Sequence, residues 1–332
     1  MLARLLGCLL IGLVAFDVFR TVLLPSARGL VDRGWVILLW RVARVLRGRW
    51  ARQAAGPLSI VLTIATWLGL LWLAFALVYL PSVGSLGYSS DVQFQGSDLV
   101  AALYLSGTVL TTLGIGDVAA QTDGLRMVVV LQSAAGLALF TAAIGYLPAI
   151  YTVISDLRSS VEAVSDLQVT TPERAVELLG ENAVLTLESV RRDVISARQH
   201  LLRFPVLHWF HPPSGQSVLA LVEGATLLWV AARLGFSAQA HGAVQRHAEA
   251  LELALRRLVD DAQQHVGGQA DEAARERARE LVRQARAAVR GVDDGQGAVD
   301  EPSAEAIDDL ARAHAVMRRY AEVHGYPIPT AF

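Results

Sequence analysis

The sequence predicts an all-α membrane protein whose spanning helices are joined to a helical, water-soluble region. Of its 332 residues, 53% are hydrophobic and 18% are charged, and the mean hydropathy is +0.41. Soluble domains carry about 25% charged residues. The charges are also uneven: residues 1–155 hold ten Arg, six Asp and no Glu, whereas 156–332 hold nineteen Arg and twenty-five acids. This division excludes a wholly soluble enzyme and a disordered chain.

Composition excludes several further classes of protein. The net charge is −2 and no long basic block occurs, so a nucleic-acid partner has no electrostatic basis. Cys8 is the single cysteine, which rules out an internal disulfide and a cysteine-based zinc site. No nucleophile–histidine–acid set, phosphate-binding loop or dinucleotide motif is present. We therefore expect neither an enzyme nor a cofactor.

Three segments are long and apolar enough to cross a bilayer: 5–24, 58–80 and 127–155. The third, as a helix, would reach roughly 44 Å, whereas the hydrocarbon core measures about 30 Å. We expect it to project beyond the membrane on one side.

Arginines predict the orientation of these spans. Seven of them lie between the first and second spans: Arg28, Arg33, Arg41, Arg44, Arg47, Arg49 and Arg52. Positively charged loops favour the cytoplasmic side. Residues 25–56 and the C-terminal half should then be cytoplasmic and 81–123 external, in a multi-pass protein of the plasma membrane.

The segment 34–47 leaves the number of crossings open at three or four. It reads as an amphipathic helix on the inner membrane face, with Trp35 and Trp40 at the headgroups. A fourth crossing is the alternative, and arginines at every third position also resemble a voltage sensor. On the first span, Asp17 and Arg20 are three residues apart and are expected to form an ion pair.

Between the second and third spans lies a short apolar segment followed by two glycines. Ser97 or Asp98 can cap a helix over 98–111 of about 20 Å, too short to cross and return. The next residues, TLGIGD (112–117), resemble the potassium-channel signature TVGYGD, and Thr111 completes the double threonine that commonly opens it. The resemblance implies a re-entrant pore helix, with its negative C-terminal end directed at a central cavity.

By this resemblance, the backbone carbonyls of Thr112, Leu113, Gly114, Ile115 and Gly116 form the selectivity filter and bind permeant K⁺. The two glycines can adopt left-handed conformations, Thr112 can add a hydroxyl at the inner end, and Leu113 and Ile115 pack behind the strand. One chain supplies one such strand, and a ring of carbonyls needs four. The partners implied are therefore three further copies in a homotetramer, monovalent cations and the lipid bilayer.

The sequence departs from the potassium-channel pattern at two positions. Ile115 stands where Tyr or Phe is usual, and Thr108 stands where many channels carry an acid partner for Asp117 at the outer mouth. Three functions therefore stay open: a potassium-selective channel, a weakly selective channel that also passes Na⁺, and a non-conducting membrane sensor or scaffold with a pore-like fold.

The third span would be the pore-lining inner helix. Gly136, Gly145 and Pro148 are candidates for a gating hinge or kink. Close packing between helices is the alternative explanation for the glycines. Whether Gln132 and Ser133 face the ion or a neighbouring helix is left open by their spacing.

The C-terminal half predicts a helical bundle. Helical patterns cover 172–179, 181–204, 217–234, 238–266, 270–290 and 304–324. The apolar segment 217–234 contains Glu223 and is expected to be a core helix rather than a fourth span. The break at 211–216 and the linker at 291–303 separate these helices.

Three domains are expected: 1–56 as a first span with an interfacial helix, 57–158 as the pore domain, and 159–332 as a helical cytoplasmic domain. The segments FDVFRTVLLP (16–25), IGYLPAIY (144–151) and HLLRFPVLHWF (200–210) resemble an uncharacterised bacterial family that joins a potassium-channel-like pore to a helical region. His208 and His211 are three residues apart, but no third ligand lies nearby in the sequence. We therefore expect no bound metal besides the permeant ion, and a role of these histidines in sensing pH or metal stays open.

Overall fold

The computed structural model divides the chain into two compact units, each described here by itself. The first comprises Met1–Thr152 and Phe204–Val206, and the second comprises Val153–Arg203 and Leu207–Phe332. The residues that the structure describes are 1–23, 29–46, 49–88, 97–209, 217–235, 242–292, 304–326 and 328. Their regular structure is almost entirely helical, which confirms the all-α membrane class.

Four long or medium helices and one short helix build the first unit. Their bounds are α1 Leu2–Val18, α2 Leu30–Leu46, α3 Arg49–Tyr79, α4 Asp98–Leu110 and α5 Asp123–Ser165, of which the last continues into the second unit. A π-helical turn, η1 Phe19–Leu23, extends α1, and a 3₁₀ turn, η2 Leu80–Ser85, follows α3.

Three stretches of the described residues are long and apolar enough to cross a membrane. They are Leu2–Val22, Ala54–Ser85 and Asp123–Ser165, which match the three predicted spans. The third has 43 residues, so its excess length is also as expected. The helix α2, of 17 residues, is not among these stretches of the described chain.

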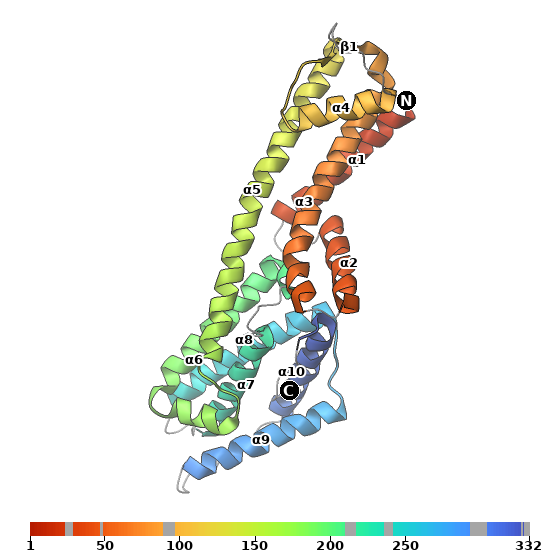
Figure 1. Cartoon of the computed structure of the whole chain (residues 1–332). Helices are drawn as coiled ribbons and strands as arrows, with labels where there is room; N and C mark the ends of the chain where they lie inside the picture. Colours follow the sequence, from red (N-terminus) through yellow and green to blue (C-terminus); the bar gives the residue numbers. More distant parts are fainter. Residues whose placement is uncertain are drawn as a thin grey trace. The chain divides into compact units, whose positions relative to one another are not determined.

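The helix α2 packs along α3 (Figure 1). The indole Nε1 of Trp35 donates a hydrogen bond of 2.8 Å to the hydroxyl of Thr66. Val36 and Trp40 are buried, with 6% and 5% of their surface exposed. Both tryptophans therefore contact protein, and their position at the lipid headgroups stays a prediction.

The predicted ion pair between Asp17 and Arg20 is wrong. The buried Asp17 carboxylate accepts hydrogen bonds from the Trp67 indole, at 2.8 Å, and from the backbone N–H of Leu30. The guanidinium of Arg20 instead lies over the ring of Phe16. A carboxylate at the first residues of a helix satisfies free N–H groups and the helix dipole, so Asp17 fastens the start of α2 to α1 and α3.

A two-stranded ladder, absent from the sequence prediction, lies at the end of the first unit where α3 ends and α5 begins (Figure 1). Strand β1 (Leu86–Tyr88) pairs antiparallel with β2 (Val118–Ala120), and Gly87 lies opposite Ala119. Because β2 directly follows residues 112–117, the ladder anchors that segment to the end of α3.

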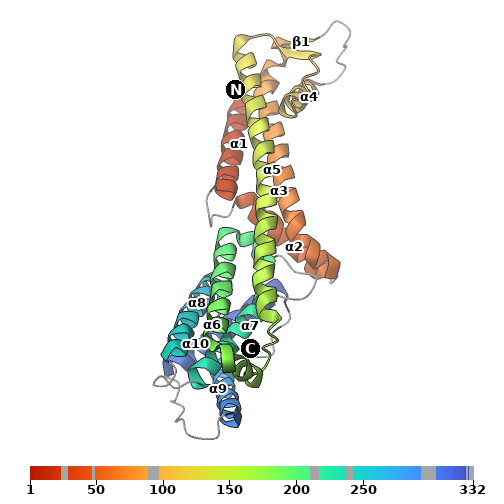
Figure 2. The ribbon, with the colours of Figure 1, turned by 90° about the vertical axis from the view of Figure 1, so that its left-hand side faces the viewer.

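The second unit is a bundle built around one apolar helix (Figure 2). Its helices after α5 are α6 Pro172–Arg203, α7 Val218–Gly235, α8 Gly242–Val266, α9 Glu272–Val292 and α10 Ala304–His324. The 3₁₀ turn η3 Pro205–Trp209 begins in the first unit and ends in the second. The core helix is α7, which packs on α6, α8 and α9. A non-helical residue, Asn182, divides α6 close to the predicted boundary. The predicted break at 211–216 and most of the linker at 291–303 lie outside the described residues.

Candidate functional site

The short helix α4 ends inside the first unit and leads directly into the glycine-bearing segment. Its 13 residues span about 20 Å, too little to cross a bilayer. Ser97 takes the N-cap position as predicted, although its side chain makes no capping bond. Ala101, Ala102 and Leu105 are buried, and α4 packs on α3. The helix therefore has a fixed C-terminal end from which residues 112–117 emerge.

Alternate residues of this segment have left-handed backbones. The φ angles are +56° at Thr112, +52° at Gly114 and +84° at Gly116. Alternation between left- and right-handed residues turns successive carbonyl groups toward one side, as the filter interpretation requires. The two glycines were expected to adopt this conformation, whereas Thr112 was not. A β-branched residue at positive φ is a true outlier, and such strain concentrates at functional sites.

The N–H groups and carbonyl groups of the segment differ in their partners. The N–H groups of Leu113 and Gly114 donate to the carbonyl oxygen of Thr108, at 2.8 and 3.3 Å, and that of Thr112 donates to Val109 at 3.1 Å. Within the described part of the chain, no carbonyl oxygen from Thr112 to Gly116 accepts a hydrogen bond. The end of α4 thus holds the segment by its donors and leaves five consecutive acceptors open.

The side chains of Leu113 and Ile115 are 65% and 59% exposed in the single chain. Leu113 lines one end of a groove of about 490 Å³ bounded by α3, α4 and α5, whose walls include Trp72 and Phe140. The predicted packing behind the strand is therefore not supplied by this chain alone.

Tyr104 supplies the partner of Asp117 that the sequence left unidentified. Its hydroxyl donates a hydrogen bond of 2.7 Å to Oδ2 of Asp117, while Oδ1 accepts from the N–H of Val118 at 3.0 Å. Thr108, the position compared with an acid partner, turns its hydroxyl to the carbonyl of Leu105 instead. Tyr104 lies one helical turn before Thr108, but only the fold shows that its hydroxyl reaches the carboxylate.

A buried polar chain joins α3, α4 and α5 behind the segment. Gln132 is fully buried; it accepts from the hydroxyl of Tyr79 and donates to both oxygens of Ser106, each at 2.8 Å. The Ser106 hydroxyl then donates to the carbonyl of Trp72 at 2.7 Å. Gln132 therefore faces the neighbouring helices, which answers the question that its spacing left open. Thr111 bonds within its own helix, to the carbonyl of Gly107.

The three hinge candidates of α5 have different surroundings. A Cβ on Gly136 would lie 2.5 Å from the carbonyl oxygen of Leu110, whereas a Cβ on Gly145 would meet no atom within 4 Å. Gly136 therefore permits close contact between α5 and the end of α4. Pro148 lies inside α5, which continues through it, and removes one backbone donor.

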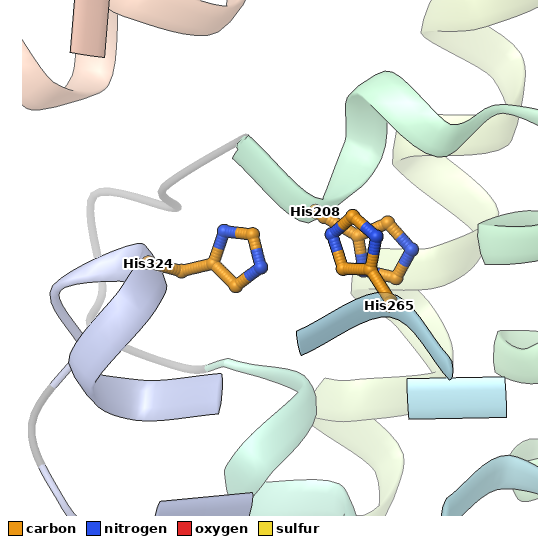
Figure 3. Close-up of side chains that lie close together, drawn as sticks. All are labelled: His208, His265 and His324. Carbon is orange, nitrogen blue, oxygen red and sulfur yellow. The ribbon is translucent and has the colours of Figure 1, made fainter. Parts of the chain in front are cut away.

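The fold places His208 beside two histidines from distant parts of the sequence. His208, His265 and His324 each offer one ring nitrogen, and these nitrogens lie within 4.8 Å of one another (Figure 3). The expectation of no metal-ligating set considered only residues near His208 in the chain. His211 lies outside the described residues.

Comparison with known proteins agrees with the geometry of the first unit. Residues 66–152 match a family model described as an ion channel. That range begins within α3 and includes α4, the segment 112–117 and most of α5. This part of the membrane protein is thus similar to an ion-channel domain.

One relative is similar over a larger part of the chain. It is the uncharacterized membrane protein YdjJ of Bacillus subtilis (strain 168), 27% identical over 221 residues. The alignment covers 63% of this chain and 63% of the relative, so the chain spans less than two thirds of that protein's length. No solved structure matches.

Proposed function

We propose that this protein is a potassium-selective channel whose filter is formed by residues 112–116. The observation that carries the proposal is a segment of alternating backbone handedness whose five carbonyl oxygens accept no hydrogen bond from the described residues. An unsatisfied carbonyl at membrane depth costs several kcal/mol. A dehydrated cation coordinated by such oxygens removes that cost, and conduction needs no covalent chemistry.

The proposed assembly is a homotetramer. One chain contributes one carbonyl strand, and a closed ring around an ion requires symmetry-related copies. Leu113 and Ile115 are largely exposed in the single chain, and non-helical backbone at membrane depth must be enclosed in protein. Neighbouring subunits would cover both side chains and place Asp117 and Tyr104 at the outer mouth.

The proposed topology follows from the arginine bias and the three spans. Residues 81–123 face outward, and residues 159–332 form a cytoplasmic helical domain of a plasma-membrane protein. Residues 57–158 are the pore domain, and residues 1–56 contribute the first span and α2.

A second candidate is a weakly selective monovalent cation channel, favoured by Ile115. The carbonyls are unchanged by this residue, but Ile lacks the ring and hydroxyl that brace the filter strand when Tyr stands there. A filter free to widen discriminates less between K⁺ and Na⁺. A third candidate is a membrane sensor that retains the fold without conducting.

Flux measurement with a matched pair of glycine variants tests these candidates. Purified protein in liposomes is assayed for K⁺ and Na⁺ flux and for reversal potential in opposed gradients. Gly114→Ala places a Cβ on a residue at φ +52°, whereas Gly12→Ala places one on an ordinary helical residue of α1 with open space. The left-handed conformation costs a non-glycine residue roughly 1–2 kcal/mol in each of four chains.

We expect Gly114→Ala to lower K⁺ flux at least about tenfold and Gly12→Ala to leave it unchanged. A reversal potential near the K⁺ equilibrium value supports the selective channel, and one near zero supports the weakly selective channel. If the folded wild-type protein gives no flux, the non-conducting membrane sensor is the candidate that remains. Equal flux through both variants would exclude residues 112–116 as the conduction path.

A further inference from the structure

We propose that His208, His265 and His324 form a binding site for a divalent transition-metal ion, with Zn²⁺ the ion best suited to it. The inference concerns the second unit alone and is independent of ion conduction. The three residues come from three separate segments: His208 from η3, His265 from α8 and His324 from α10 (Figure 3).

The distances suit a shared ion after a small adjustment. One ring nitrogen from each residue lies within 4.8 Å of the other two. Zn–N bonds of 2.0–2.1 Å at tetrahedral angles separate ligand nitrogens by about 3.4 Å. The rings of His208 and His265 stack at 4.2 Å with planes 19° apart, and the ring of His324 is also nearly parallel to them. Binding therefore requires the side chains to rotate until the ring planes converge on the ion.

The donor set selects a class of metal. Three neutral imidazoles are the ligands of many zinc sites, and imidazole also suits Cu²⁺, Ni²⁺ and Fe²⁺. Mg²⁺ and Ca²⁺ prefer oxygen ligands, which these side chains do not offer. A fourth position would remain for water or another ligand, since three side chains leave a tetrahedral ion one ligand short.

Two helix ends provide a favourable potential for a cation. His265 is the penultimate residue of α8, and His324 is the last residue of α10. Each helix is followed by a glycine in the left-handed region, Gly267 at φ +75° and Gly325 at +69°. The carbonyl groups at a helix C-terminus carry about half a negative charge. Two such ends at one cluster partly offset the positive charge of an ion.

Tyr320 orients one of the three rings. Its hydroxyl oxygen lies 2.8 Å from Nδ1 of His208. With the proton on Nδ1, His208 donates this hydrogen bond and leaves Nε2 to bind the metal. Metal-binding histidines are usually held in this way by a partner on the second nitrogen. His208 and His324 are buried among aromatic rings that include Trp209, whose ring centroid lies 4.5 Å from that of His324. His265 is half-buried, so the site is partly shielded from bulk water and stays accessible to an ion.

Cobalt titration of the full-length protein tests the site. The protein is purified without a polyhistidine tag, treated with EDTA, placed in nanodiscs and titrated with Co²⁺, whose visible spectrum reports tetrahedral ligation. We expect about one Co²⁺ per chain, displaced by Zn²⁺. His265→Asn and His324→Asn should each weaken binding at least about tenfold, and Tyr320→Phe should weaken it about tenfold or more through loss of the orienting bond.

His200→Asn is the matched control, because His200 lies on α6 outside the cluster. It should bind Co²⁺ like the wild type. Binding that is absent, or that is equally strong in the cluster variants and the control, would overturn the proposal.

X-ray absorption of the Zn²⁺-loaded wild type provides a test that does not depend on the folding of any variant. The proposal requires a nitrogen and oxygen first shell near 2.0 Å with the outer-shell scattering of about three imidazoles. A first shell without imidazole scattering would contradict it.

Discussion

Tyr104 and Thr112 show how single residues shape the segment 112–117. The Tyr104 hydroxyl holds Asp117 beside the point where β2 begins, and Thr112 adopts a backbone conformation that its side chain disfavours. Neither role follows from residue type. A tyrosine on an apolar helix usually packs or faces lipid, and a threonine usually adopts an extended or helical backbone. The contacts of α4 decide both cases.

Replacement of Tyr104 by Phe removes the hydrogen bond to Asp117 and keeps the ring. A hydrogen bond to a charged group contributes roughly 1.5–3 kcal/mol, and the proposed tetramer contains four such bonds. We expect K⁺ flux in liposomes to fall at least about tenfold with helical content unchanged. Tyr151→Phe is the control, since Tyr151 is 58% exposed on α5. Flux that is equal in the two variants would show that the outer-mouth bond does not support conduction.

At the scale of the helices, the close contact between α4 and α5 depends on a glycine, which has no side chain. Gly136 allows the carbonyl oxygen of Leu110 to approach within 2.5 Å of where a Cβ would stand. The sequence predicted these helices but left Gly136 undecided between hinge and packing, because both uses need a small residue. The approach of α4 from another part of the chain favours packing.

Gly136→Ala should therefore force α5 away from the end of α4. Overpacking of this kind lowers the free energy of unfolding by roughly 1–3 kcal/mol. The opposing atom is the backbone carbonyl oxygen of Leu110, which cannot move aside as a flexible side chain could. We expect a lower midpoint of thermal unfolding in detergent and reduced flux. The control is Gly12→Ala, at a position on α1 where a Cβ meets no atom within 4 Å, and it should match the wild type in both measurements. A variant at Gly136 with wild-type stability would argue for a hinge instead.

The short ladder of β1 and β2 illustrates a limit of pattern analysis. Three residues per strand are too few to establish an alternating pattern, so the all-helical prediction missed both. The three spans were predicted closely, since long apolar segments without charge have few alternative structures.

Over the whole chain there are two units with different cores, and the chain passes between them within α5 and again around Phe204–Val206. The second unit has its own apolar centre in α7, where Leu228 is fully buried, and its surface carries many ion pairs. A unit with its own core can fold independently.

A fragment of residues 153–332 is therefore expected to be helical and to unfold cooperatively in the absence of lipid. Circular dichroism during heating or urea titration measures this transition. Leu228→Ala should lower the free energy of unfolding by about 2–5 kcal/mol, because it creates a cavity in the core. Leu185→Ala, at a position 70% exposed on α6, should change it little. A fragment without a cooperative transition would mean that the second unit needs the membrane unit to fold.

Local properties of the chain were sufficient to predict the spans, the short helix before residues 112–117, the glycine conformations and the core helix of the bundle. Hydrophobic length, helical periodicity and the conformational freedom of glycine depend on neighbours within one or two turns. The bond between Tyr104 and Asp117, the hydrogen bonds of Asp17 and Gln132, and the cluster of His208, His265 and His324 join residues that packing brings together. Such contacts depend on how whole helices pack against one another, and no spacing within one segment encodes them.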